Sequence, residues 1–119
     1  MRVTAKDFNV FKKEAIKWIK FFGLIGWEIK FEKGIPNADG AQAWCSMNYT
    51  AKTASLGISS EINDDEDIRL CAFHEVCELL LGNIRVQAQA RFTEEQELEA
   101  AIHDVIQRLV NSVFKPIGV

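Results

Sequence analysis

The chain has 119 residues, 48% of them hydrophobic and 26% charged, which fits one globular domain over residues 1–119. Its 14 basic and 17 acidic residues give a formal net charge of -3 without a basic block, which argues against nucleic acid as the main ligand. No apolar run reaches the roughly 20 residues that span a bilayer, and the N-terminus has no signal-peptide pattern. We therefore expect a cytoplasmic protein that does not enter a membrane and keeps its three cysteines as thiols.

The first predicted element is an amphipathic helix over residues 5–22, because apolar residues recur there at steps of three and four. Thr4 can cap its start, and Gly23 can end it. Three strands are predicted next, over residues 27–33, 42–49 and 54–59. A small antiparallel sheet of about three strands is the simplest assembly of these segments.

Two long helices are predicted for the rest of the chain. The first follows Asn63, carries four acidic residues (64–67) in its first turn, where they complement the helix dipole, and runs to a break at Gly82. The second begins with a capping-box pattern at Thr93 and ends near Phe114. The predicted fold class is therefore α+β, with an N-terminal helix, a small sheet and two long helices.

The segment from His74 to Glu78 reads HEVCE and lies within the first of these two helices. Residues four apart project from one helical face, so His74 and Glu78 can reach the same ion. The segment differs from the zinc-binding pattern HExxH only in Glu78, which stands where the second histidine would be. By the same pattern Glu75 would be the general base.

A zinc site needs at least one more protein ligand, and His103 is the only other histidine of the chain. His74, Glu78 and His103 supply two imidazoles and one carboxylate. Glu99 precedes His103 by four residues and lies beside the apolar stripe of the last helix, so it either orients His103 or binds the metal itself. Two plainer interpretations compete with the metal site: a solvated face of an acidic helix, and a Glu99–His103 pair that braces two helices.

A helical wheel with about 100° per residue places the apolar residues around Phe73 in one arc. We therefore expect this helix to bury one side and to present His74, Glu75 and Glu78 from the other, toward a cleft or toward solvent. Cys71 shares the face of His74 and is either a small buried residue or a soft metal ligand.

The run from Phe73 to Leu81, together with residues 99–103 and 107–111, resembles small phage and prophage proteins with a zincin-type, metallopeptidase-like core. The resemblance extends over most of the chain. It implies a minimal zincin-like arrangement, in which a small sheet packs on an active-site helix, related in plan to SprT-like metallopeptidases. His74 would then correspond to the first zinc ligand and Glu75 to the catalytic glutamate, whereas Glu78 departs from the pattern.

Two functions compete on this basis. The first is a zinc-dependent hydrolase of the metallopeptidase type, in which Zn²⁺ held by His74, Glu78 and His103 activates water for attack on a peptide carbonyl and Glu75 is the general base. Its protein substrate could pair as an extended strand with residues 54–59. The second is a catalytically inactive zincin-like module of phage or prophage origin that binds a protein partner, which the replacement of a histidine by Glu78 favours.

Overall fold

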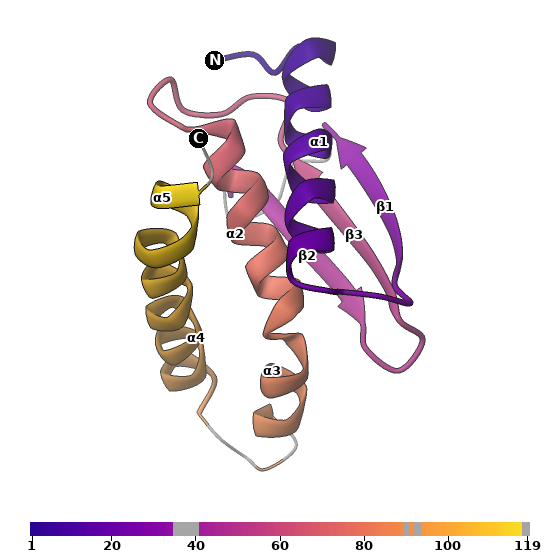
Figure 1. Ribbon diagram of the computed structural model, residues 1–119, viewed down its shortest axis with the longest axis vertical. Coiled ribbons are helices and arrows are strands. Elements are labelled where there is room, and N and C mark those ends of the chain that lie inside the picture. The colour runs from indigo at the N-terminus through magenta and orange to yellow at the C-terminus, as the bar shows by residue number, and fades with distance from the viewer. Residues whose placement is uncertain (35–40, 90, 92–93, 118–119) are drawn as a thin grey trace.

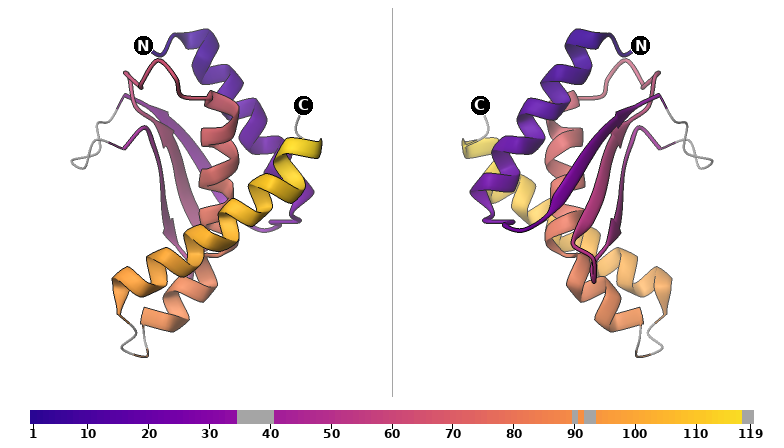
Figure 2. Two further views of the ribbon diagram at one scale, coloured as in Figure 1. Left: turned by 90° about the vertical axis from the view of Figure 1, so that its left-hand side faces the viewer. Right: turned by 90° about the vertical axis from the view of Figure 1, so that its right-hand side faces the viewer.

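The computed structural model describes residues 1–34, 41–89, 91 and 94–117 and has the predicted α+β class (Figure 1). Helices α1 and α2 lie on the same face of a three-stranded sheet, and α2 lies between α1 and α4 (Figure 1, Figure 2). The elements in chain order are α1 (Ala5–Phe21), β1 (Glu28–Lys33), β2 (Ala43–Asn48), β3 (Thr53–Ile58), α2 (Ile68–Leu80), α3 (Gly82–Gln89), α4 (Glu95–Leu109), the π-helical turn η1 (Val110–Phe114) and α5 (Lys115–Ile117).

The sheet is mixed, so the prediction of an antiparallel sheet is wrong. The strand order is β1-β3-β2, in which β3 pairs in parallel with β1 and antiparallel with β2. Strands β2 and β3 form a hairpin whose turn includes Lys52 at φ 58°. The connection from β1 to β2 therefore joins strands that are not neighbours. Alternation of side chains identifies a strand but carries no information about its partner, which is why the order could not be read from the periodicity.

Helix α1 confirms the predicted N-terminal helix and its cap. The Thr4 hydroxyl accepts a hydrogen bond from the backbone N–H of Asp7, and the Asp7 carboxylate accepts one from the N–H of Thr4. Gly23 follows the helix at φ 66°, a left-handed conformation that glycine adopts without strain. The inner face of α1 joins the core, where the Trp18 and Phe73 rings meet edge to face with centroids 4.8 Å apart.

Helix α2 is buried on more than one side, which corrects the expectation from the helical wheel. Its N-terminal half packs against α1, and further contacts join it to β2, β3 and α4. Glu75, which the wheel placed on the outer side, is only 8% exposed. A wheel assumes that a helix has a single buried face, whereas this helix lies between the sheet and two other helices.

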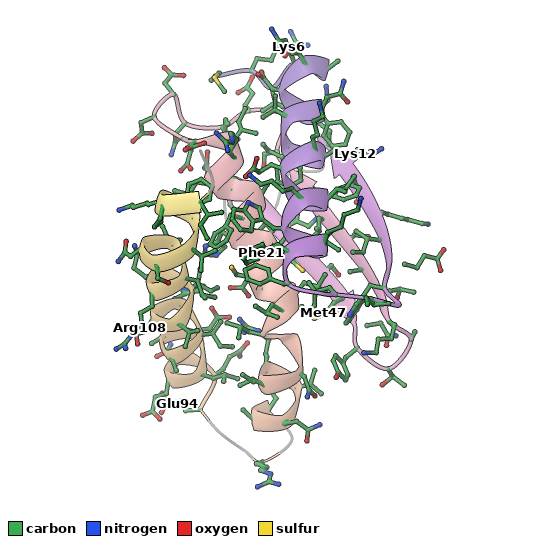
Figure 3. The ribbon with its side chains drawn as sticks, viewed as in Figure 1. Lys6, Lys12, Phe21, Met47, Glu94 and Arg108 are labelled. Atoms are coloured by element: carbon green, nitrogen blue, oxygen red, sulfur yellow. The ribbon has the colours of Figure 1, made fainter. Side chains whose placement is uncertain are left out.

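The two ends of α2 differ from the prediction in detail. The helix begins at Ile68. Of the four acidic residues before it, Asp67 is the N-cap and accepts hydrogen bonds from the backbone N–H groups of Arg69 and Leu70. The predicted break near Gly82 is confirmed, and the chain continues beyond it as α3. Met47 lies in β2 (Figure 3). A Cβ atom on Gly82 would overlap the thioether of Met47, so glycine permits this close approach.

The last helical segment extends further than predicted. Helix α4 begins at Glu95, and helical structure continues through η1 and α5 to Ile117, beyond the expected end at Phe114. The capping hydrogen bonds expected of Thr93 lie outside the described residues. In the part of the chain that the structure describes, no helix is long and apolar enough to cross a membrane.

Candidate metal centre

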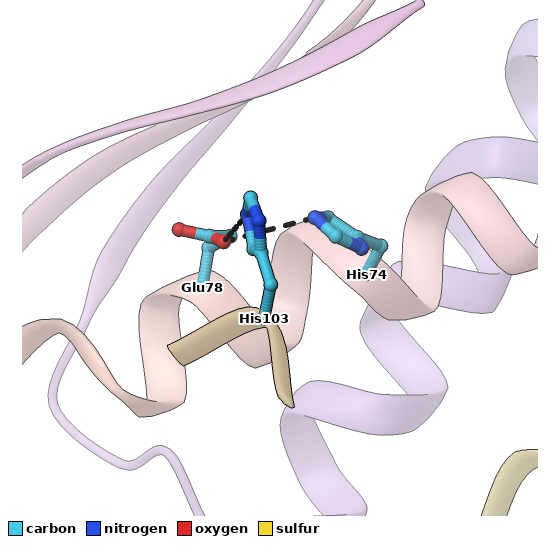
Figure 4. Close-up of side chains that lie close together, drawn as sticks. All are labelled: His74, Glu78 and His103. Carbon is cyan, nitrogen blue, oxygen red and sulfur yellow. Dashed lines mark ion pairs between the residues drawn. The ribbon is translucent and has the colours of Figure 1, made fainter. Parts of the chain in front are cut away.

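Three of the predicted metal ligands meet where α4 passes α2. His74 and Glu78 lie one turn apart on α2, and His103 reaches them from α4 (Figure 4). The Oε1 atom of Glu78 is 3.7 Å from Nε2 of His74 and 3.3 Å from Nε2 of His103. One donor atom from each residue lies within 4.8 Å of the other two, so a single ion could contact all three.

Glu78 contributes a buried oxygen that has no hydrogen bond. Its Oε2 atom accepts one from Nη2 of Arg85 at 3.0 Å, whereas Oε1 is enclosed and has no donor among the described residues. An unpaired buried polar atom costs about 1–3 kcal/mol. A cation between Oε1 and the two imidazole nitrogens would remove that cost, and two imidazoles with one carboxylate are a donor set that Zn²⁺ uses. The three residues therefore fit a zinc ion.

Burial favours the form of His74 that can bind a metal. It lowers the pKa of the His74 imidazole below the ordinary value of 6.5; Glu78 opposes this shift, and His103 adds to it. A neutral imidazole has a lone pair for a metal ion, whereas a protonated one does not. At 3.7 Å, the Nε2 atom of His74 is too distant to donate a hydrogen bond to the Oε1 atom of Glu78.

Arg85, in α3, is the residue of this cluster that sequence reasoning missed. Its guanidinium joins two carboxylates, with Nη2 at 3.0 Å from Oε2 of Glu78 and Nη1 at 2.5 Å from Oε1 of Glu99. The spacing between Glu78 and Arg85 in the sequence is the signal that could have identified it. Arg85 follows Glu78 by seven residues, about two helical turns, so the two residues share one helical face. The break between α2 and α3 conceals that relation in the sequence.

Glu99 lies at the rim of the cluster. Its Oε2 atom is 3.6 Å from Nε2 of His103, the same nitrogen that faces Glu78, and its side chain is 42% exposed. An acceptor that orients a metal-binding imidazole contacts the other ring nitrogen, so this geometry does not match the orienting role. Glu99 was expected to need a partner because it lies beside the apolar stripe of its helix. That partner is Arg85, which forms an ion pair with Oε1 of Glu99.

Glu75, the predicted general base, faces a cavity of about 290 Å³ that His74 also lines. Burial, and to a smaller extent the charge of Glu78, raises the pKa of the Glu75 carboxyl to about 8. No hydrogen bond or ion pair is formed by this carboxyl among the described residues. A carboxyl with such a pKa can take up and release protons near neutral pH, as a general base must.

Cys71 lies beside the cluster and is held as a thiol. Burial, together with the charge of Glu66, raises its pKa to about 12. Its side chain is 9% exposed, and Sγ lies 3.5 Å from Oε2 of Glu66, to which it donates a hydrogen bond. Metals bind the thiolate, so this environment favours the first of the two predicted roles of Cys71, that of a small buried residue.

The strand expected to receive a substrate does not have a free edge. Residues 54–59 fall largely in β3, which pairs with β1 on one side and β2 on the other. The free edge close to the cluster belongs to β2, whose first residue, Ala43, lines the same cavity as His74 and Glu75. The expectation for residues 54–59 is therefore wrong, because it was made without knowledge of the strand order.

Comparison of the chain with family models, with curated proteins and with solved structures gave no match in any of the three.

Proposed function

We propose that the protein is a zinc-dependent hydrolase of the metallopeptidase type, with His74, Glu78 and His103 as the zinc ligands. One observation carries the proposal: the unpaired, enclosed Oε1 atom of Glu78 faces the Nε2 atoms of both histidines. Two acceptor-bearing rings and a carboxylate oxygen at this spacing are stabilised by a cation between them. The resemblance to zincin-like phage proteins supports the same proposal.

The site residues divide the chemistry between them. A bound zinc ion supplies a Lewis acid that polarises a carbonyl group and makes a nearby water molecule more acidic. Glu75 accepts a proton from the attacking water and passes it to the leaving amine. The elevated pKa of its carboxyl supports this role, because a stronger base removes the proton more effectively and still releases it near neutral pH.

The proposed substrate is an extended stretch of protein. The edge of β2 that is not paired with β3 offers backbone hydrogen bonds to such a segment, and Ala43 brings this strand to the cavity beside His74.

The three cysteines are free thiols, which supports a cytoplasmic location.

A non-catalytic module that binds a protein partner is the second candidate. The ion pair of Arg85 with Glu78 favours it, because a guanidinium 3.0 Å from Oε2 already neutralises part of the charge that would attract a metal. In that case the cluster would hold α2, α3 and α4 together without turnover.

Metal analysis of protein purified without a histidine tag separates the two candidates. We expect close to one zinc per chain in the wild type and its loss in His74→Ala and in His103→Ala. Gln96→Ala, at an exposed position of α4, is the control and should keep the metal. A wild-type protein that folds normally and contains no zinc would contradict the metal site.

Glu75→Gln tests the catalytic step itself. This variant should retain zinc, because Glu75 is not a proposed ligand, and should lose hydrolysis of an unfolded protein substrate by about 10²–10⁴-fold. Equal hydrolysis by variant and wild type would remove Glu75 as the base. A zinc-loaded wild type without any hydrolysis would favour the non-catalytic module.

A further inference from the structure

The cavity beside the candidate metal centre extends along the N-terminal half of α2. It has a volume of about 290 Å³, which exceeds that of a single amino-acid side chain. Its lining consists of Gln42 and Ala43 at the start of β2 and, from the segment that leads into and forms α2, Glu66, Leu70, Cys71, His74 and Glu75. A group bound at the metal centre would therefore have this space next to it.

Two carboxyl groups line the cavity, and neither is saturated with hydrogen bonds. Glu75 is 8% exposed and has no hydrogen-bond or ion-pair partner among the described residues. Glu66 accepts one weak hydrogen bond, from the Cys71 thiol to Oε2, and no described residue donates to its Oε1 atom. A buried acid without a partner costs free energy, so the cavity is suited to a ligand that brings hydrogen-bond donors.

The nearby cations do not neutralise this cavity. Arg69 points to Glu14, 3.0 Å away, and the N-terminal ammonium group pairs with Asp64 at 2.8 Å. The carboxylate of Asp67 lies at the positive end of the α2 dipole, where it accepts hydrogen bonds from the backbone N–H groups of Arg69 and Leu70. No cation among these therefore neutralises Glu66, whose carboxylate favours a positively charged group beside it.

The apolar part of the wall suits an aliphatic stem. Leu70 and Ala43 supply apolar surface in the same cavity. A lysine or arginine side chain has this character, because its methylene groups pack on apolar surface while its charged end remains hydrogen-bonded. A neutral aliphatic side chain would fill the same space and would add no donor to either carboxyl group.

We infer that this cavity receives a substrate side chain ending in an ammonium or guanidinium group, and that Glu66 is the residue that recognises the cation. This inference rests on the proposed hydrolase function, to which it adds the substrate class: protein segments with a lysine or arginine next to the bond that is cleaved.

Binding of two matched probes to the full chain tests the inference without requiring turnover. N-acetyl-lysine amide carries the ammonium group, and N-acetyl-norleucine amide has a similar chain without it. In titrations followed by NMR, with and without added zinc, we expect the lysine probe to bind the wild type about tenfold more tightly at low salt and to shift the signals of residues that line the cavity. Glu66→Gln should abolish this difference.

Asp65→Asn is the matched control, because it removes the same charge one residue away at an exposed position outside the cavity lining. It should preserve the preference for the lysine probe. Equal binding of the two probes by the wild type, or an undiminished preference in Glu66→Gln, would overturn the inference. Failure of the proposed function looks different, since the protein would then lack zinc or hydrolysis while the preference for the lysine probe persisted.

Discussion

Glu14 in α1 and Glu78 in α2 are both carboxylates enclosed between helices, and each contacts an arginine. The Glu14 side chain is 8% exposed and receives Nε1 of Trp18 at 2.7 Å and Nζ of Lys17 at 2.8 Å on Oε2, and Nε of Arg69 at 3.0 Å on Oε1. Glu78 is 15% exposed and has Arg85 on Oε2 but no donor on Oε1.

The difference between these two carboxylates separates a structural role from a ligand-binding role. Every oxygen of Glu14 has donors supplied by the chain, so the group is complete when the protein folds. The free oxygen of Glu78 faces the Nε2 atoms of two imidazoles, and each Nε2 offers a lone pair when the proton of the neutral ring is on Nδ1. Only the second arrangement gains from an added cation, and Glu14 is therefore an internal reference for the site.

The largest expected effect is an opposite dependence of stability on pH for Glu75 and Glu14. The pKa of Glu75 is raised from its ordinary value of 4.5 to about 8, mainly by burial. The metal-free protein should therefore lose stability as the pH rises from about 4.5 to about 8, by up to about 5 kcal/mol at roughly 1.4 kcal/mol per unit. Denaturant unfolding of EDTA-treated Glu75→Gln should not show this loss; a parallel decline in both proteins would contradict it.

Glu14 should act in the other direction. Burial tends to raise its pKa, but hydrogen bonds from Lys17, Trp18 and Arg69 outweigh burial and hold the pKa below 4.5. The stability that Glu14 contributes is thus present above pH 4.5 and is lost as the pH falls through its lowered pKa. In Glu14→Gln the acid limb of the stability profile should become shallower, and an unchanged acid limb would contradict the assignment.

The next effect concerns metal binding. Glu78→Gln should weaken zinc binding by more than about a hundredfold. Removal of a residue that only hydrogen-bonds to a metal ligand already lowers metal affinity by about 10–100-fold, and Glu78 is a proposed ligand itself. Glu14→Gln should leave zinc affinity unchanged. Competition titration with a zinc chelator measures both, and equal losses in the two variants would remove the distinction between the carboxylates.

The free energy of unfolding should be affected in the reverse order, more by Glu14→Gln than by Glu78→Gln. Glu14→Gln should lower the free energy of unfolding at pH 7 by about 2 kcal/mol, because Arg69 and Lys17 lose a hydrogen-bonded charge. Metal-free Glu78→Gln should be affected less, since its Oε1 atom has no hydrogen bond to lose. Glu97→Gln, an exposed position on α4, is the control. A larger loss for Glu78 than for Glu14 would mean that the cluster is a structural brace.

Arg85→Lys should have the smallest effect. The substitution keeps the charge but cannot contact Glu78 and Glu99 with one planar fork, so we expect about a tenfold loss of zinc affinity if Arg85 positions Glu78. A gain in affinity would show instead that Arg85 competes with the metal for the carboxylate.

Local sequence signals predicted most of the elements and the three-residue cluster. The Thr4 cap, the end of α1 at Gly23 and the break at Gly82 depend on neighbouring residues, and all three are confirmed. The meeting of His103 with His74 also agrees with the sequence, because both were expected on consecutive helices.

The features that sequence reasoning missed depend on contacts between distant segments. The place of β3 in the centre of the sheet and the burial of Glu75 both follow from how helices and strands pack together, which periodicity does not encode. Arg85 was missed because both of its partners lie on other helices, Glu78 on α2 beyond the break at Gly82 and Glu99 on α4. Because β3 is the central strand, the expected substrate edge changes from β3 to β2. The packing of α2 places Glu75 at a cavity.

Anomalous diffraction at the zinc edge, from crystals of the wild-type protein grown with zinc, tests directly whether His74, Glu78 and His103 hold a zinc ion. We expect one strong peak about 2.1 Å from Nε2 of His74, from Nε2 of His103 and from an oxygen of Glu78. The absence of a peak between these three side chains, with their arrangement unchanged, would contradict the assignment of Glu78 as a metal ligand.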